Sequence, residues 1–131
     1  MRQSQFILLV EDEAFIALML QDLLESAGFS VIAVQSADEA KAVLSSRLDE
    51  IAAMISDIRL GGSTGDGWAL AQHARAARPQ LPIIYLSGGG SDDHAALGVA
   101  DSLLLTKPFT ATQFLSAIAQ LLDKPSACLV S

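Results

Sequence analysis

An uninterrupted apolar run that ends abruptly on a carboxylate constrains this chain more than any other feature. The run covers residues 52–55 and leads directly into Ser56 and Asp57, and glycines follow at positions 61 and 62. A continuous apolar run closed by a turn signal is typical of a strand buried on both faces of a sheet. Asp57 would then lie at the carboxyl end of a central strand, where open α/β sheets place their ligand crevice. The alternative is that Asp57 only opens the turn, as aspartates often do.

Further short apolar runs alternate with segments of helical composition along the chain. Strands are predicted at 6–10, 30–34, 82–87 and 102–105, and helices at 14–27, 37–46, 68–77, 111–122 and, short and weak, at 91–98. Ser36 and Thr110 are expected to cap the helices that follow them. Because strands that alternate with helices form parallel sheets, the sequence predicts a single doubly wound α/β domain, (βα)5 and flavodoxin-like, with strand order 2-1-3-4-5.

The charge and composition of the chain indicate which kinds of partner and which cellular compartment to expect. The 131 residues carry a formal net charge of −7 and contain no basic run, so direct binding of nucleic acid lacks an electrostatic basis. The first residues are too few for a signal peptide, and no apolar run reaches transmembrane length. The single cysteine, Cys128, excludes an internal disulfide and suits a reducing compartment. We therefore expect a cytoplasmic protein without membrane contact.

Polar side chains follow four of the five predicted strands. They are Glu11 and Asp12, Asp57, Ser87 and Lys107. Because the carboxyl ends of parallel strands meet at one edge of the sheet, three carboxylates should converge there beside one hydroxyl and one ammonium. Carboxylates that close together raise each other's pKa unless a cation lies among them, and clustered oxygen ligands of this kind suit Mg²⁺. The sequence therefore predicts a magnesium site at this edge.

These motifs together resemble the receiver domain of two-component response regulators, over roughly residues 5–122. The matching segments are Val10-Glu11-Asp12, Ser56-Asp57, Leu86-Ser87-Gly88 and Lys107-Pro108-Phe109. The resemblance implies a receiver domain over 1–122 and a short tail over 123–131, with no output domain. It also implies that a histidine kinase or histidine phosphotransfer protein phosphorylates Asp57 with the help of Mg²⁺ or Mn²⁺.

The resemblance assigns roles to individual site residues. Asp12 would be a direct metal ligand and Glu11 a ligand through water, and Asp57 and the backbone carbonyl of Arg59 would complete the set. Ser87 would hydrogen-bond the phosphoryl group after transfer.

The resemblance also implies how the site would act as a switch. Lys107 would form an ion pair with the phosphoryl group, and the Lys107–Pro108 peptide bond is expected to be cis. The implied protein is a switch that acts through contacts with an unknown downstream protein, as a monomer or a phosphorylation-dependent dimer. It is no enzyme beyond self-phosphorylation from a phosphodonor and autodephosphorylation.

The switch itself departs from the usual receiver pattern. Leu104 stands where receivers carry an aromatic residue, three positions before Lys107. Tyr85 is a candidate substitute, with an ordinary core aromatic as the alternative, so the expected switch residues are Ser87, Tyr85 and Leu104. Residues 82–88 also partly match the Pro-Phe-x-Phe-Ala-Thr-Gly pattern of a receiver subclass that lacks the aromatic switch.

The first predicted helix carries more apolar residues than one buried stripe needs. Its stripe comprises Ile16, Leu20, Leu23 and Ala27, while Phe15, Leu18 and Met19 lie off it. Scattered exposed apolar residues are common, but a cluster favours a face on which the phosphodonor docks.

Other functions on a similar fold fit the residues less well. A phosphatase of the haloacid dehalogenase type needs a second acid two residues after its nucleophile, where this chain has Arg59. A phosphorylation-independent pseudo-receiver that serves only as an interaction module would not need the complete set of acids, Ser87 and Lys107. A flavin or nucleotide carrier needs a phosphate-binding loop after the first strand, where Glu11 and its acidic neighbours would repel phosphate.

Overall fold

A single parallel sheet forms the centre of the molecule. The computed structural model describes residues 6–58, 66–87, 102–107 and 109–130. Its strands are β1 (Phe6–Val10), β2 (Ser30–Val34), β3 (Ile51–Asp57), β4 (Ile83–Ser87) and β5 (Leu103–Thr106), in the order β2-β1-β3-β4-β5. The predicted flavodoxin-like topology is therefore confirmed.

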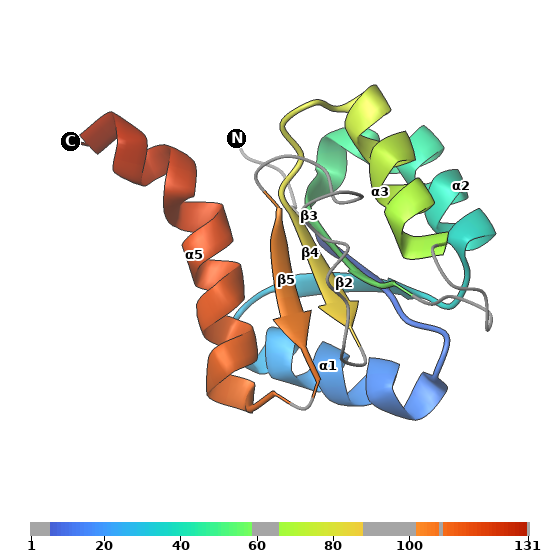
Figure 1. Ribbon diagram of the computed structural model, residues 1–131, viewed down its shortest axis with the longest axis horizontal. Helices are drawn as coiled ribbons and strands as arrows, with labels where there is room; N and C mark the ends of the chain where they lie inside the picture. The colour runs from blue at the N-terminus through green and yellow to red at the C-terminus, as the bar shows by residue number, and fades with distance from the viewer. Residues whose placement is uncertain (1–5, 59–65, 88–101, 108, 131) are drawn as a thin grey trace.

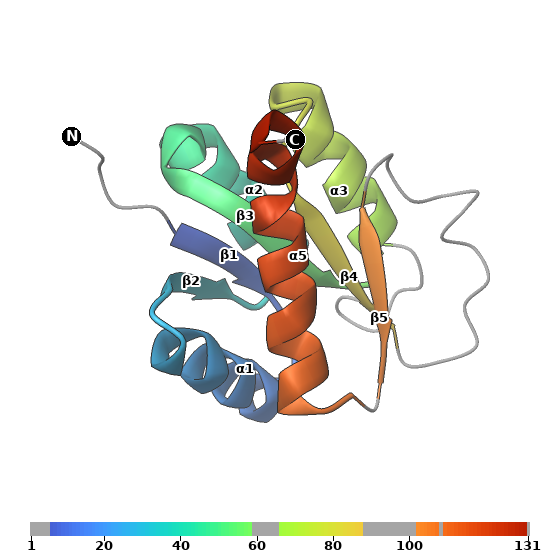
Figure 2. The same ribbon diagram turned by 90° about the vertical axis from the view of Figure 1, so that its left-hand side faces the viewer.

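Helices cover both faces of this sheet. They are α1 (Ala14–Ser26), α2 (Ala37–Arg47), α3 (Asp66–Ala77) and α5 (Ala111–Val130), and a single 3₁₀ turn, η1 (Leu48–Glu50), leads into β3. The helices α1 and α5 pack on one face of the sheet, while α2 and α3 lie together on the other (Figures 1 and 2). The weak helix predicted at 91–98 falls outside the described residues.

The core divides into two apolar layers, one on each side of the sheet. Alternate residues of a strand face opposite sides, so Leu8 packs toward α2 and α3 while Ile7 and Leu9 pack toward α1 and α5. In β3, Met54 and Ile55 are both fully buried, one in each layer. The prediction that the run before Asp57 is a strand buried on both faces is therefore confirmed. Each large side chain buried in this way stabilises the fold by roughly 1.5–3 kcal/mol.

Side chains cap two helices as predicted. Ser36 Oγ accepts a hydrogen bond from the backbone N–H of Glu39 at 3.1 Å, and Glu39 Oε1 accepts one from the backbone N–H of Gln35 at 2.7 Å. Thr110 and Gln113 form a reciprocal pair before α5, with distances of 3.0 and 2.8 Å. Each cap satisfies donors that the helix leaves unpaired and contributes about 1 kcal/mol.

The buried face of α1 differs from the predicted stripe. Ala17, Leu20 and Leu24 are its buried residues, while Ile16 and Leu23 are only partly buried. Ala27, predicted to face inward, is exposed because the helix ends before it and the chain turns at Gly28, whose φ is +98°. Leu20 belongs to both the predicted stripe and the observed buried face, while Ala17 and Leu24 replace the other predicted positions.

Two other helix boundaries differ from the sequence prediction. The helix α3 begins at Asp66, two residues earlier than predicted, and α5 continues to Val130 where a short tail after Leu122 was expected. Pro125 therefore lies within α5, although a proline usually ends a helix just before it. None of the described helices combines the length and the hydropathy that crossing a membrane requires.

Candidate functional site

The polar residues predicted to converge do lie together at the carboxyl edge of the sheet. Asp57 is the last residue of β3, Ser87 is the last residue of β4, and Lys107 directly follows β5. Asp57 is in register with Leu86 of β4, so the side chains come from adjacent strand ends. Glu11 continues from β1, where its backbone N–H donates to Val34 O of β2 at 3.1 Å.

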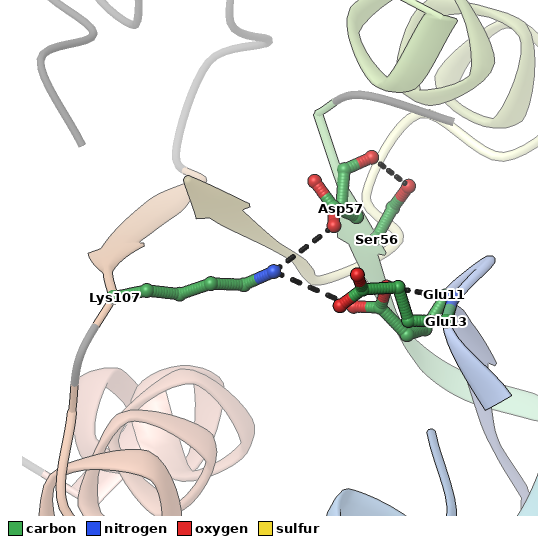
Figure 3. A network of polar contacts seen from close by, with 5 residues as sticks. All are labelled: Glu11, Glu13, Ser56, Asp57 and Lys107. Atoms are coloured by element: carbon green, nitrogen blue, oxygen red, sulfur yellow. Dashed lines mark hydrogen bonds and ion pairs between the residues drawn. The ribbon is translucent and has the colours of Figure 1, made fainter. Parts of the chain in front are cut away.

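The Lys107 side chain bridges two carboxylates at this edge. Its Nζ lies 3.0 Å from Asp57 Oδ2 and 3.7 Å from Glu11 Oε1, and Figure 3 shows the extended side chain reaching both. Burial lowers the pKa of Lys107, but the hydrogen bond and the charges of Asp57 and Glu11 outweigh it, so the pKa lies above its usual value. Lys107 is therefore a permanent cation at this site.

Glu11 is the most deeply buried charged residue of the site, with no exposed surface. Its Oε2 accepts a hydrogen bond from the backbone N–H of Glu13 at 3.2 Å, whereas no group in the described part of the chain hydrogen-bonds its Oε1. Burial raises the pKa of Glu11 to about 7. The Glu13 N–H and Lys107 act against this shift, and the nearby charge of Asp57 adds to it. The hydrogen bond from Glu13 and the charge of Lys107 therefore do not fully offset the cost of burying a charged Glu11 carboxylate.

Three carboxylates form a cluster with the dimensions of a cation site. One oxygen each from Glu11, Asp12 and Asp57 lies within 4.8 Å of the others, and Asp12 is partly exposed while the other two are buried. Hard oxygen donors are the ligands that Mg²⁺ and Mn²⁺ prefer, and the unsatisfied Glu11 Oε1 leaves an acceptor for such an ion or its water. The residues present therefore fit a divalent cation. The carbonyl of Arg59 and the Lys107–Pro108 bond involve positions outside the described residues.

Hydrogen bonds fix the ends of the site strands. Within β3, Ser56 Oγ donates to the carbonyl oxygen of Asp57 at 3.0 Å, and between strand ends the Ile58 N–H donates to Leu86 O at 3.0 Å. The Lys107 N–H donates to Ser87 O at 2.7 Å. These hydrogen bonds fix the backbone of the strand ends that carry Asp57 and Lys107.

The proposed switch residues occupy the core beneath the site. Tyr85 is fully buried, and its ring lies 4.5 Å from the ring of Trp68, centroid to centroid, at 57°. Leu104 is in register with Tyr85 and packs partly buried against the same layer. A role of Tyr85 and Leu104 in switching stays a prediction, because both are ordinary core residues in this state.

The structure also brings one residue to the site, Gly67, that the sequence analysis did not single out. Gly67, near the start of α3, packs directly on the backbone of Asp57 and Ile58, and the next residue, Trp68, packs on Tyr85. The only sequence signal was that Gly67 belongs to a segment rich in glycine, which indicates a turn without revealing a close approach.

Comparison with known proteins agrees with this arrangement. Residues 7–119 match the family model of the response regulator receiver domain. The chain belongs to this family. As a receiver domain it is a module of two-component signal transduction, and neither the phosphatase nor the pseudo-receiver alternative is favoured.

The receiver domain is similar to parts of longer proteins from different organisms. It is 33% identical over 95% of its length to the C4-dicarboxylate transport transcriptional regulatory protein DctD of Rhizobium meliloti (strain 1021), of which the match covers 26%. It is 29% identical over 92% of its length to the sensor kinase CckA of Brucella abortus (strain 2308), of which 13% is covered. The receiver domain thus spans only a fraction of these relatives.

A solved structure matches the receiver domain along almost its whole length. The crystal structure of a response regulator receiver protein from Sinorhizobium medicae WSM419 has a TM-score of 0.85 and 40% sequence identity. The match covers 92% of this receiver and 96% of that chain.

Proposed function

We propose that this receiver accepts a phosphoryl group on Asp57 from a histidine kinase or a histidine phosphotransfer protein and then acts as a switch through contacts with a downstream protein. The observation that supports this most directly is the 3.0 Å contact between Lys107 Nζ and Asp57 Oδ2 beside the carboxylates of Glu11 and Asp12. It combines a nucleophilic carboxylate, a fixed cation and a candidate metal cluster at one strand end.

Asp57 would act as the nucleophile of the transfer. One of its carboxylate oxygens forms a bond to phosphorus while the bond from phosphorus to the donor's imidazole nitrogen breaks, and the imidazole leaves with the electron pair. Asp57 has 7% of its surface exposed, enough for a donor to reach it from the edge of the sheet. The phosphoryl group is later lost by hydrolysis, in which water attacks the phosphorus of the acyl phosphate, inorganic phosphate leaves and the Asp57 carboxylate is restored.

Glu11, Asp12 and Asp57 would hold the divalent cation that this chemistry requires. Mg²⁺ or Mn²⁺ bound there supplies positive charge to the oxygens of the transferring group. Burial is the main cause of the raised pKa of Glu11, and the nearby charges of Asp57 and Asp12 raise it further, so the three carboxylates repel one another when no cation lies among them.

Lys107 and Ser87 would recognise the phosphoryl group once it is attached. Lys107 already contacts the Asp57 carboxylate, so it can move its hydrogen bond to a phosphoryl oxygen with little displacement. Ser87 ends the neighbouring strand and is nearly buried, which suits a hydroxyl donor that shifts toward the new oxygens. The added charge would then bias the segments that follow β4 and β5 toward an active arrangement.

The exposed apolar cluster on α1 is the proposed docking face for the phosphodonor. Phe15, Leu18 and Met19 have 82%, 59% and 49% of their surfaces exposed. They lie on the helix that directly follows the acidic pair of the site, so a donor bound there would be adjacent to Asp57. The receiver would act in the cytoplasm, as a monomer or as a phosphorylation-dependent dimer.

Intact mass spectrometry tests the phosphoacceptor directly. The receiver is incubated with acetyl phosphate, with and without Mg²⁺, beside Asp57→Asn and the control Asp38→Asn, which changes an acid on the exposed surface of α2. One added phosphoryl group is expected for the native protein and for Asp38→Asn, only with Mg²⁺, and none for Asp57→Asn. Phosphorylation of Asp57→Asn to the native extent would show that another residue is the acceptor.

A further inference from the structure

The start of α3 makes an unusually close approach to the backbone of the phosphoacceptor. Gly67 N–H donates a hydrogen bond to Ile58 O at 2.8 Å, directly after Asp57. A Cβ atom at position 67 would lie 2.6 Å from Ile58 Cα and 3.1 Å from the Asp57 carbonyl carbon, and would clash with the Asp57 carbonyl oxygen. All three are backbone atoms, so no side-chain rotation can relieve the contact.

Position 67 requires glycine because there is no room for a Cβ atom, and not because its backbone adopts a conformation that only glycine favours. Gly67 lies within a regular α-helix, where alanine is favoured over glycine by up to about 1 kcal/mol. The only positive φ recorded for a described glycine is that of Gly28. Helix propensity alone would therefore favour replacing Gly67, and only the contact with β3 opposes the change.

A side chain at position 67 should disturb Asp57 more than the other members of the site. The three heavy atoms nearest to such a Cβ all belong to Asp57 and Ile58, at the end of β3. Glu11 extends from β1 and Lys107 from β5, so both are anchored elsewhere. Because productive phosphoryl transfer depends on positions to within about 1 Å, a small displacement of Asp57 alone would disturb the arrangement.

We propose that Gly67 is a positioning residue for Asp57, because its missing side chain lets α3 rest on the Asp57–Ile58 backbone and holds the carboxylate in register with Lys107 and Glu11. This inference rests on the proposed function, although the positioning itself is independent of phosphorylation. Trp68 extends the same contact, since it packs on Tyr85 of β4 and fixes the start of α3 against the sheet.

Gly67→Ala tests the proposal, with Gly28→Ala as a matched control. A Cβ at Gly28 meets no heavy atom within 4 Å, but the φ of +98° strains any residue other than glycine, so this control loses stability at the opposite edge of the sheet without touching the site. Both variants are compared at equal folded fraction, measured by circular dichroism. If Gly67→Ala is partly unfolded in buffer, both are measured in sucrose, which favours the compact state.

Two readouts separate positioning from stability. The first is the carboxyl ¹³C resonance of Asp57, assigned by its loss in Asp57→Asn, which should shift in Gly67→Ala and stay unchanged in Gly28→Ala. The second is the rate of phosphorylation by acetyl phosphate with Mg²⁺, which should fall roughly tenfold to a hundredfold per folded molecule only in Gly67→Ala. An unshifted resonance together with an unchanged rate in Gly67→Ala would overturn the proposal. Failure of the native protein to become phosphorylated by acetyl phosphate would count against the proposed function and leave the resonance as the test of Gly67.

Discussion

Lys107 Nζ lies 3.0 Å from Asp57 Oδ2 and within 3.7 Å of Glu11 Oε1, so one ammonium compensates carboxylates from two different strands. The Lys107 side chain keeps only 25% of its surface exposed, and Glu11 keeps none. Ion pairs this well buried interact strongly, but removing one partner leaves a desolvated charge. The stability of the fold and the chemistry of the site therefore depend on the same three side chains.

Replacing Lys107 by methionine should destabilise the fold at neutral pH. The substitution keeps an unbranched apolar stem as far as Cε but leaves Asp57 and Glu11 without their cation, which should lower the free energy of unfolding by about 1–3 kcal/mol. Urea denaturation measures this, and Lys41→Met on the exposed surface of α2 is the control, with an expected change within about 0.5 kcal/mol. Equal losses in the two variants would show that the pair at the site contributes nothing specific.

Glu11 should make the stability of the metal-free protein fall as the pH rises. Burial raises the pKa of Glu11 from its ordinary value of 4.5 to about 7 in the folded protein, so the folded state binds this proton more tightly than the unfolded chain does. The contribution of Glu11 to the stability is therefore greatest below about pH 4.5 and is lost as the pH rises toward 7. A shift of this size corresponds to roughly 3 kcal/mol. Glu11→Gln should abolish this decline and be the more stable protein near pH 8, as measured by urea denaturation at several pH values in EDTA. A native protein whose Glu11-dependent stability rises over this window would contradict the prediction.

Divalent cations should stabilise the receiver, and more strongly at higher pH. An ion that binds only the folded state adds about 2.7 kcal/mol at a hundred times its Kd. Because binding requires the Glu11 carboxylate, the affinity for Mg²⁺ should increase as the pH rises through about 7. Thermal melting with Mg²⁺ or EDTA measures the effect. Asp12→Asn should weaken it, and the same stabilisation in Asp12→Asn as in the native protein would argue against a site at the three carboxylates.

A charge on the exposed apolar cluster of α1 should slow transfer from a protein donor alone. Leu18→Asp places a charge between Phe15 and Met19 without entering the core, since more than half of Leu18 is exposed. The rate with a cognate phosphodonor protein should fall about tenfold or more, in the range seen for residues central to an interface. The rate with acetyl phosphate should not change. Ala42→Asp, on the exposed surface of α2 across the sheet, is the control, and equal loss with both donors would contradict a docking role.

Much of the fold could be predicted because its signals are local in the sequence. The alternation of apolar runs and helical segments led to the strand order, and the capping patterns at Ser36 and Thr110 located two helix starts. The buried face of a helix was less predictable, since α1 buries Ala17 and Leu24 where a different stripe was expected. The exact face that a helix buries depends on how it is rotated against the sheet, which no short-range pattern specifies.

By itself, the sequence determined that Glu11, Asp12, Asp57, Ser87 and Lys107 meet at one edge, because parallel strands share the direction in which they end. Only the tertiary structure decided how these groups affect one another. It showed that Glu11 is fully buried with an oxygen to which none of the described residues donates a hydrogen bond, that Lys107 bridges two carboxylates, and that α3 rests on the backbone of Asp57 through Gly67. Burial, pKa and close backbone contact depend on the packing of residues that are distant in the chain, and therefore arise only when the layers of the fold come together.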